Sequence, residues 1–239
     1  MDDNWKIRTE LLIGKENSNK LANSHVLVAG LGGVGSYTVE QLCRAGIGKL
    51  TIVDGDTVHK SNRNRQLAAL ISTEGTPKTE VIAHRLRDIN PAIELTIVNQ
   101  YVKDDSLIEL MQQPYDFVVD AIDTLAPKVM LLYYAHRFGQ QVVSSMGAGG
   151  KFDPSQILVV DIAETNSCRL AYYIRKKLHT MDVWTGITTV YSPEVVSRGA
   201  VQLESGEFNK KSSVGTISYM PAIFGCICAS VVIRGILEK

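Results

Sequence analysis

The sequence predicts an α/β protein whose Rossmann-like, doubly wound sheet is mostly parallel and is extended by antiparallel strands in the C-terminal half. The first observation is that short apolar runs, typical of buried strands, alternate with helical patterns over about the first 150 residues. The second is a glycine-rich turn between the first of these runs and the first long helical pattern. With 239 residues, of which 45% are hydrophobic, the chain is long enough to bury a full core.

The elements of the first half follow one another in the order of a doubly wound sheet. The first strand covers 25–29, the glycine turn at 30–35 opens a helix, and the next strand ends at Asp54. The Thr-Pro-Lys sequence at 76–78 is typical of a helix start, so Lys78 is expected on the first turn of a helix that continues to about residue 90. The remaining predicted elements are a strand at 94–99, a helix at 105–112, a strand at 115–120, a helix at 127–138 and a strand at 141–146.

Beyond residue 150 the pattern changes. We expect an extended segment at 156–165, a basic helix at 170–178, a loop-rich stretch and an apolar helix within 217–237. The length of that last helix also fits a membrane span, but Pro221, Gly225 and Arg234 interrupt it. A buried core helix is therefore the favoured prediction, and the sequence holds no firm evidence of membrane contact.

Composition and charge exclude several classes of protein. The 25 Lys and Arg residues balance 25 Asp and Glu residues, so nucleic acid or an anionic membrane would have to bind a local patch. The four cysteines form no CxxC pair, and Cys43 falls inside a predicted helix, which argues against a zinc site and a disulfide framework. The first residues do not resemble a secretory signal, so a cytoplasmic location fits best. Because no linker interrupts the chain, we expect one domain over 1–239.

The glycine turn contains Gly30, Gly32, Gly33 and Gly35. Backbone N–H groups of such a turn, together with the helix N-terminus behind it, favour an anion such as phosphate. Asp54 follows Gly35 by 19 residues, near the spacing at which an acid meets ribose hydroxyls. Asp56 completes a D-G-D sequence, for which a pair of turn-forming aspartates is the alternative. Adenine nucleotide binding is the prediction, because open parallel sheets bind ligands at the carboxyl ends of their strands.

A second element is the polar, arginine-rich segment SNRNRQ at 61–66, which follows the predicted ribose site. An NAD enzyme needs little beyond the acid at this point, whereas cleavage of a triphosphate needs cations and amides around the phosphates. Asn62, Arg65 and Lys78 could supply them. The alternative is a solvated surface loop.

A third element is the pair Asp120 and Asp123, at the end of a later strand and at the same predicted sheet edge. A carboxylate beside phosphates suits Mg²⁺, and Asp123 is the predicted ligand. The alternative for either aspartate is an N-terminal cap of the next helix.

These elements together resemble the ThiF/MoeB/HesA family, which is related to ubiquitin-activating enzymes. The resemblance covers most of the first 150 residues and rests on GxGGxG, D-x-D, SNxxRQ, a lysine on the next helix and DxxD, in that order. Within the family, the sequences RTELLIG, RAGIGKLTIVD, DAID and SSMGAGGKFDP, with no paired CxxC motifs, are most similar to tRNA threonylcarbamoyladenosine dehydratases, also called cyclic threonylcarbamoyladenosine synthases.

The resemblance implies that ATP activates the carboxylate of a threonylcarbamoyl group on a tRNA adenosine next to the anticodon. The products of this step are an acyl-adenylate and pyrophosphate, and attack by the side chain's own carbamoyl group then closes a ring and expels AMP. Water is lost overall, which explains the name dehydratase. The implied partner is tRNA carrying threonylcarbamoyladenosine, and the implied cofactors are ATP and Mg²⁺.

The resemblance also implies roles for residues. The four glycines would approach ATP, Asp54 and Asp56 would lie at its ribose, and Asn62 would bind phosphate. The implied catalytic residues are Arg65, Lys78 and Asp123, of which the last would hold magnesium.

Arg8 matches an arginine that reaches the phosphates from the neighbouring subunit in relatives, which implies a homodimer with a shared active site. The alternative is a surface arginine on an N-terminal helix. The single adenylating domain would then divide into a nucleotide-binding half at about 1–150 and a substrate-side extension at about 151–239.

Cysteines and basic residues of the second half depart from the simplest pattern. Relatives that pass their adenylate to sulfur use a cysteine beyond the sheet, where Cys168 lies, although a structural cysteine is favoured because the implied mechanism needs no thioester. A sulfur-transfer (cysteine desulfurase) partner is a further possibility that the sequence leaves undecided. Cys226 and Cys228 are predicted to be packing residues. The basic cluster that could bind RNA, or simply be a solvated helix face, consists of Arg169, Arg175, Lys176 and Lys177 with Tyr172 and Tyr173, and Lys210 and Lys211 on a later loop.

Two other functions remain as alternatives. One is adenylation of the C-terminus of a ubiquitin-like sulfur-carrier protein, although enzymes of that kind more often carry two zinc-binding CxxC pairs. The other is a non-catalytic or NAD-dependent nucleotide-binding module, in which the segment 61–66 and Lys78 would have no purpose.

Overall fold

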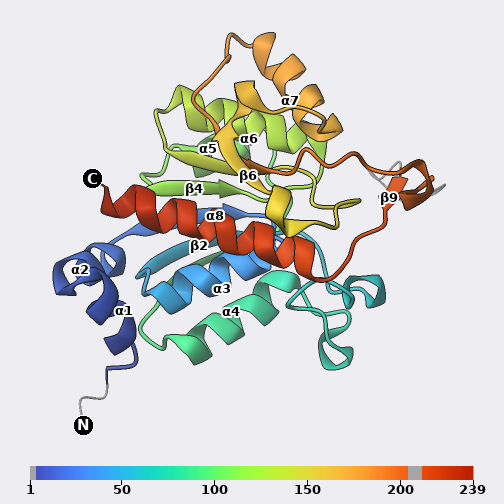
Figure 1. Ribbon diagram of the computed structural model, residues 1–239. Helices are drawn as coiled ribbons and strands as arrows, with labels where there is room; N and C mark the ends of the chain where they lie inside the picture. The colour runs from blue at the N-terminus through green and yellow to red at the C-terminus, as the bar shows by residue number, and fades with distance from the viewer. Residues whose placement is uncertain (1–3, 204–211, 239) are drawn as a thin grey trace.

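The computed structural model describes residues 4–203 and 212–238, and its centre is a seven-stranded sheet (Figure 1). The strands lie in the order β3-β2-β1-β4-β5-β7-β6, and all neighbours are parallel except β6 and β7. Their bounds are β1 His25–Ala29, β2 Lys49–Val53, β3 Glu94–Val98, β4 Phe117–Asp120, β5 Val142–Ser145, β6 Leu158–Asp161 and β7 Thr188–Tyr191. The predicted doubly wound, mostly parallel sheet is confirmed.

The strand order reverses between β1 and β4. The chain runs from β1 outward through β2 to β3, and then returns to place β4 on the other side of β1. Ala29 and Asp120, the last residues of these two strands, are paired in register. In open α/β sheets the crevice at such a reversal is where ligands bind. The carboxyl ends of β1 and β4 therefore mark the expected site.

Helices cover both faces of the sheet. Their bounds are α1 Ile7–Ile13, α2 Lys15–Ala22, α3 Gly35–Ala45, α4 Lys78–Ile89, α5 Asp104–Met111, α6 Leu125–Arg137, α7 Arg169–His179 and α8 Tyr219–Leu237. Along β1, Val26 and Val28 join the core under α3, α4 and α8, whereas Leu27 and Ala29 join the core under α5, α6 and α7. Burial on both faces explains why the central strands β1 and β4 are apolar over most of their length.

The apolar helix α8 crosses one face of the sheet beside α3, as Figure 1 shows. Among the described residues it is the one helix that is long and apolar enough to cross a membrane, a test that core helices of soluble proteins also pass. Met220, Phe224 and Cys228 on its inner face are fully buried, which agrees with the favoured core helix. Cys226 is exposed, so its prediction as a packing residue is wrong. Residues that are two positions apart lie on nearly opposite sides of a helix, so Cys226 and Cys228 could not both face the core.

The second half adds both kinds of strand. β7 continues the parallel sheet beside β5, and β6 closes the edge in the antiparallel direction. A separate antiparallel ribbon pairs β8, Val201–Leu203, with β9, Ser212–Val214. Short 3-10 helices lie at Lys60–Asn62, Ile71–Thr73, Pro154–Gln156, Ile162–Glu164 and Arg198–Ala200. Lys210 and Lys211, predicted to belong to a basic cluster, lie outside the described residues.

Candidate functional site

The glycine turn is held by close contacts of its own backbone. Gly30 has a φ of +91°, and a Cβ at this position would lie 2.7 Å from the carbonyl oxygen of Ala121. A Cβ at Gly35 would lie 1.7 Å from the carbonyl oxygen of Gly30, and one at Gly33 would lie 2.9 Å from Pro221. At Gly32, by contrast, the nearest atom would be 3.8 Å away. Packing of the chain thus requires glycine at three of these positions, whereas a Cβ at the fourth, Gly32, would lie at an ordinary contact distance from the side chain of Gln66.

Asp54 fastens the turn to the end of β2. Its carboxylate accepts hydrogen bonds from the backbone nitrogens of Leu31, at 2.6 Å, and Asp56, at 2.8 Å. Burial raises the pKa of this carboxyl above its ordinary value, and the charge of Lys78 opposes that shift. A carboxylate has about four lone-pair sites, so two backbone donors leave it able to accept ribose hydroxyls. The bond from the backbone nitrogen of Asp56 to the Asp54 carboxylate closes a turn of the kind that the D-G-D sequence predicts.

Lys78 and Asp56 form an ion pair at this edge of the sheet. Lys78 begins α4, as predicted, and is only 4% exposed, with its Nζ 2.6 Å from Oδ2 of Asp56. The hydroxyl of Tyr101, which follows β3, donates to the other oxygen of Asp56. That bond, assisted by burial and by the charges of Asp56, Asp54 and Asp123, raises the pKa of Tyr101 to about 12. The pKa of this one hydroxyl is thus raised by carboxylates that follow both β2 and β4.

The segment 61–66 lies against the glycine turn. A Cβ at Gly33 would be 3.4 Å from the carbonyl oxygen of Arg65, and one at Gly32 would be 3.8 Å from Nε2 of Gln66. Arg65 donates from Nη1 to the carbonyl oxygen of Ser61 at 3.0 Å. Asn62 is nearly buried, and its side-chain oxygen accepts the backbone N–H of His59 at 3.0 Å. The amide nitrogen of Asn62 is therefore its group suited to a phosphate, and both phosphate-binding roles stay predictions.

The two aspartates after β4 have different environments. Asp120 is fully buried with Lys128 of α6, whose Nζ lies 2.7 Å from its carboxylate, and Ser144 donates to the same oxygen at 2.6 Å. Lys128 also donates to the carbonyl oxygen of Ile122 at 3.0 Å, which fixes the loop before Asp123. Asp123 is exposed at the sheet edge. The alternative that either aspartate caps α6 is wrong, because Thr124 occupies the N-cap position.

The residues around Asp123 fit one kind of magnesium site. The described part of the chain contains no group of three or more His, Cys, Asp and Glu side chains placed to hold a metal ion. Mg²⁺ is usually held by one or two carboxylates together with substrate phosphates. An exposed carboxylate near the glycine turn therefore suits an ion that would arrive with a nucleotide.

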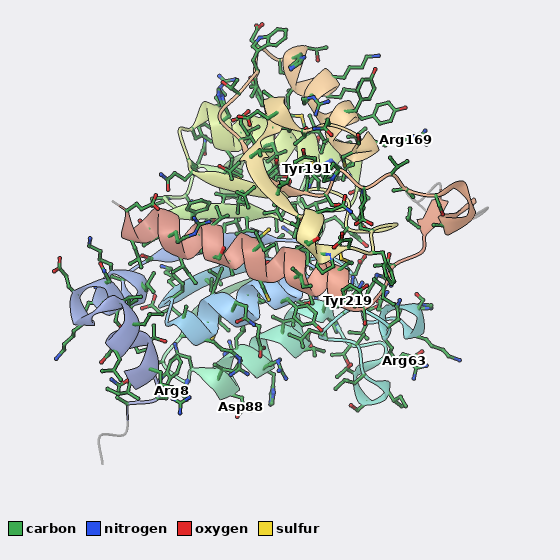
Figure 2. The ribbon with its side chains drawn as sticks, viewed as in Figure 1. Arg8, Arg63, Asp88, Arg169, Tyr191 and Tyr219 are labelled. Carbon is green, nitrogen blue, oxygen red and sulfur yellow. The ribbon has the colours of Figure 1, made fainter. Side chains whose placement is uncertain are left out.

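Arg8 lies far from these residues in the same chain. It is exposed on α1, and Figure 2 shows it on the opposite side of the molecule from Arg63, which belongs to the segment beside the glycine turn. Ile7, Leu11 and Leu12 of the same helix are also exposed. Within one chain, therefore, Arg8 does not join the site.

Beyond residue 150, a buried lysine and a glutamate connect two loops of the second half. Lys151 is 4% exposed and donates from Nζ to the carbonyl oxygen of Glu194, whose carboxylate accepts the backbone N–H of Asp153 at 3.1 Å. Burial lowers the pKa of Lys151, while the charges of Cys168 and Glu194 oppose that shift. Cys168, at the start of α7, is itself buried, in agreement with the favoured structural role. Sequence reasoning missed Tyr101 and Lys128, which belong to no recognisable motif, and assigned no role to Lys151, although SSMGAGGKFDP contains it.

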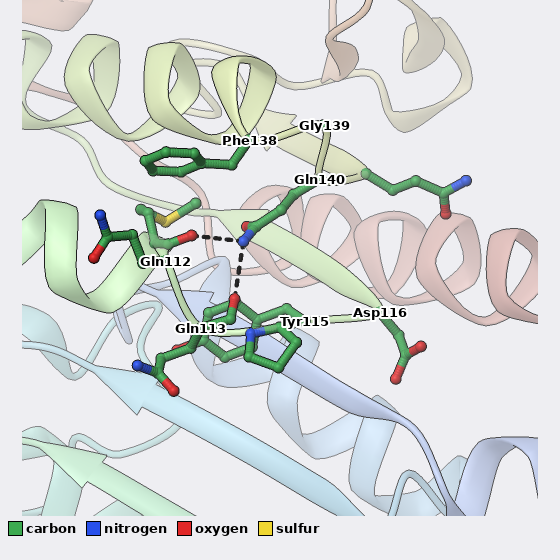
Figure 3. Close-up of a pocket in the computed structure, with 10 residues that line it drawn as sticks. Gln112, Gln113, Tyr115, Asp116, Phe138, Gly139 and Gln140 are labelled. Atoms are coloured by element: carbon green, nitrogen blue, oxygen red, sulfur yellow. Dashed lines mark hydrogen bonds between the residues drawn. The ribbon is translucent and has the colours of Figure 1, made fainter.

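A pocket of about 450 Å³ lies elsewhere, at the amino ends of β4 and β5 (Figure 3). Its walls are formed by residues 111–116 and 138–141. Gln140 spans it, with Nε2 donating to the carbonyl oxygens of Met111 at 2.6 Å and Gln113 at 3.0 Å. None of the predicted site residues lines this pocket, and it opens at the sheet edge opposite to theirs.

Fold and site together define a doubly wound α/β protein with a glycine turn of the nucleotide-binding type at its strand-order reversal. The chain belongs to the ThiF family, which it matches over residues 6–239.

Full-length relatives support this assignment. The chain is 34% identical to tRNA threonylcarbamoyladenosine dehydratase of Bacillus subtilis, over 97% of this chain and 94% of the relative. It is 35% identical to the Escherichia coli protein of the same name, over 100% of this chain and 97% of the relative. The crystal structure of that E. coli dehydratase with ATP superposes with a TM-score of 0.90 at 34% identity, covering 100% and 97% of the two chains. The same protein has been solved with AMP, with a TM-score of 0.89.

Proposed function

We propose that this protein uses ATP to activate the carboxylate of a threonylcarbamoyl group on a tRNA adenosine next to the anticodon, and that the activated group then cyclises with net loss of water. One observation carries the proposal: a glycine turn bonded to Asp54, a buried Lys78 paired with Asp56, and the exposed carboxylate of Asp123 lie at the carboxyl ends of β1, β2 and β4. The names of the full-length relatives, and the ATP and AMP complexes of one of them, support the same reaction.

The chemistry assigns a task to each part of the site. The carboxylate oxygen of the substrate attacks the α-phosphorus of ATP, and pyrophosphate leaves. Negative charge then gathers on the departing phosphates, where positioned cations and N–H donors stabilise the transition state. We assign this task to Lys78, Arg65 and Asn62, and the ribose to Asp54. An ammonium has three donors, so Lys78 keeps two after its bond to Asp56.

The bound magnesium ion would supply charge neutralisation at the phosphates, and we propose Asp123 as its ligand from this chain. The buried Lys128 holds the loop that carries Asp123, because its Nζ donates to the carbonyl oxygen of Ile122. This support keeps the carboxylate at the sheet edge before the nucleotide arrives.

We also propose a homodimer in which Arg8 completes the site of the partner subunit. α1 is 7 residues long, and its Leu11 and Leu12 are 79% and 85% exposed. A matching surface lies next to the segment 61–66. It is a hollow lined by Arg63 and Asn64, and the exposed side chains of Leu70 and Ile71 also line it. Two exposed apolar surfaces of this kind are typical of protein interfaces.

The location and other partners are further proposals. We place the protein in the cytoplasm, since all four cysteines are free thiols and two of them, Cys43 and Cys228, are buried in the core. A sulfur-transfer (cysteine desulfurase) partner would have to uncover Cys168, which is 8% exposed. We keep the interpretation of residues 1–239 as a single adenylating domain.

The first test replaces Lys78 by alanine. The protein is mixed with labelled ATP and either tRNA carrying threonylcarbamoyladenosine or a diglycine-ended carrier, and AMP is measured. We expect AMP with the tRNA alone, and a loss of about 10²–10³ in rate for Lys78→Ala, because one cation at the phosphates is removed. The exposed Lys20 on α2 provides the control Lys20→Ala, which keeps the wild-type rate. AMP formed only with the carrier, or a fully active Lys78→Ala, would overturn the proposal.

Mixing variants tests the shared site. Arg8→Ala and Lys78→Ala each damage every site of their own homodimer, but a mixed dimer has one site with both residues intact. An equal mixture should recover about a quarter of the wild-type rate, because half the dimers are mixed and half of their sites are whole. Mass measurement first verifies that the subunits have exchanged. If the mixture then recovers no activity, the placement of Arg8 in the partner's site is refuted.

A further inference from the structure

The helix α7 has one buried face and one exposed face of unusual composition. Ala171, Ile174 and Leu178 are fully buried against the core. The outward face, which we call the α7 face, consists of Arg169, Tyr172, Tyr173, Lys176 and Lys177, and all five are exposed. Their spacing of three and four residues places them on a single side of the helix. Arg175, the other cation of the predicted basic cluster, instead turns inward and donates to the carbonyl oxygen of Ile162 at 3.4 Å.

Two tyrosine rings form the centre of the α7 face. Tyr172 and Tyr173 are 53% and 40% exposed, and their ring centroids lie 5.3 Å apart at an interplanar angle of 71°. The guanidinium of Arg169 lies 5.7 Å from the ring of Tyr173. Exposed rings beside an arginine offer flat surfaces on which unpaired bases stack.

The charge of the α7 face contrasts with that of the whole chain. Its Arg and two Lys residues are accompanied by no Asp or Glu anywhere in residues 169–180, although the chain as a whole has a net charge of zero. Cations in a row beside stacking surfaces fit a polymer that has phosphates and exposed bases together. An acidic protein would have no bases to stack on the two rings.

The α7 face also begins on the correct side of the molecule. Just before α7, Asn166 donates to the hydroxyl of Tyr191, the last residue of β7, so the helix starts at the carboxyl edge of the sheet. Figure 2 shows Arg169 and Arg63 toward the same side of the molecule, with Tyr219 of α8 on that side as well. The glycine turn lies close to Pro221 in the same helix as Tyr219. The α7 face therefore extends outward from the edge that holds the candidate site.

We propose that the α7 face binds the anticodon arm of the tRNA whose adenosine enters the site, with the tyrosines stacking on unpaired bases and the cations contacting phosphates. This proposal rests on the proposed function, because it names how the RNA substrate of that site is held. It gives the neutral chain the local patch that RNA binding requires.

The test compares three full-length variants: Tyr172→Ala/Tyr173→Ala, Lys176→Ala/Lys177→Ala and, as the matched control, Tyr172→Phe/Tyr173→Phe. The measurements are the KM for tRNA carrying threonylcarbamoyladenosine, the kcat, the affinity for ATP alone and the dissociation constant for the tRNA at several salt concentrations. We expect the alanine pair of tyrosine changes to weaken tRNA binding by about 5- to 100-fold, while the phenylalanine pair retains it because the rings remain. The lysine pair should lower the salt dependence by about one phosphate contact for each cation.

The outcomes separate this proposal from the proposed function. A raised KM for tRNA, with unchanged ATP affinity and kcat, supports the α7 face as the tRNA surface. If the wild type forms AMP with the tRNA but the variants bind tRNA normally, the α7 proposal is overturned and the function stands. If the wild type forms no AMP with the tRNA, both are overturned. A change in oligomeric state or in binding of an acidic polypeptide, with tRNA affinity intact, would assign the surface to a protein partner and also overturn it.

Discussion

Replacing Lys128 by methionine removes one partner of a fully buried ion pair while nearly conserving the shape of the side chain. Asp120 would keep its bonds from Ser144 and from the backbone of Ile122, but it would lose the cation 2.7 Å away. Breaking a buried pair by removing one partner typically costs about 3–5 kcal/mol, because it leaves an uncompensated charge. We therefore expect Lys128→Met to lower the free energy of unfolding at pH 7 by about that amount.

The loss should depend on pH with a definite sign. Burial raises the folded-state pKa of Asp120 above its ordinary 3.8, and Lys128 is the main influence that lowers it. A carboxyl with a raised folded pKa binds its proton more tightly in the folded state, so its favourable contribution is present below the ordinary pKa and is lost as pH rises through the folded one. Without Lys128 the folded pKa rises further. The variant should therefore lose less stability, relative to wild type, at pH 5 than at pH 7.

Urea unfolding followed by fluorescence at both pH values measures the effect. Asp120→Asn combined with Lys128→Met should recover most of the stability, because the double variant buries no charge. The exposed pair Lys49 and Glu94, whose charged atoms are 3.8 Å apart, gives the matched control, and Lys49→Met should cost at most about 1 kcal/mol. A loss below about 1 kcal/mol for Lys128→Met, or one that is equal at both pH values, would refute the reasoning.

Three further predictions concern the glycine turn and the cysteines of α8. Gly35→Ala should destabilise the fold by more than about 2 kcal/mol, because its Cβ would meet the carbonyl oxygen of Gly30 at 1.7 Å. Gly32→Ala should keep the wild-type melting temperature and lose ATP affinity, and unchanged ATP titrations would contradict a phosphate at this turn. Exposed Cys226 should react with a maleimide in the folded protein, while Cys228, whose pKa burial raises to about 12, should react only after unfolding, as mass spectrometry would show.

The sequence predicted the parts of this structure that depend on local pattern. Apolar runs identified the strands, and the Thr-Pro-Lys start placed Lys78 on the first turn of α4. The sequence did not predict which side chains from different elements would pair. Asp120 and Lys128 are eight residues apart, and they meet only because α6 turns Lys128 toward the sheet. Tyr101 reaches Asp56 from a loop whose path no propensity specifies. The exposure of Cys226 likewise depends on how α8 is rotated against α3.

The contact between α3 and α8 has a consequence for the synthesis of this protein. The hydroxyl of Thr38 in α3 lies 3.2 Å from the carbonyl oxygen of Gly225 in α8, a residue 187 positions later. While a ribosome makes the intervening chain, the part of α3 that packs on α8 has no cover, because α8 does not yet exist. Such exposed surface in a growing chain is where aggregation begins and where chaperones bind. Slowing translation before α8 should therefore prolong the most vulnerable period in the life of the chain.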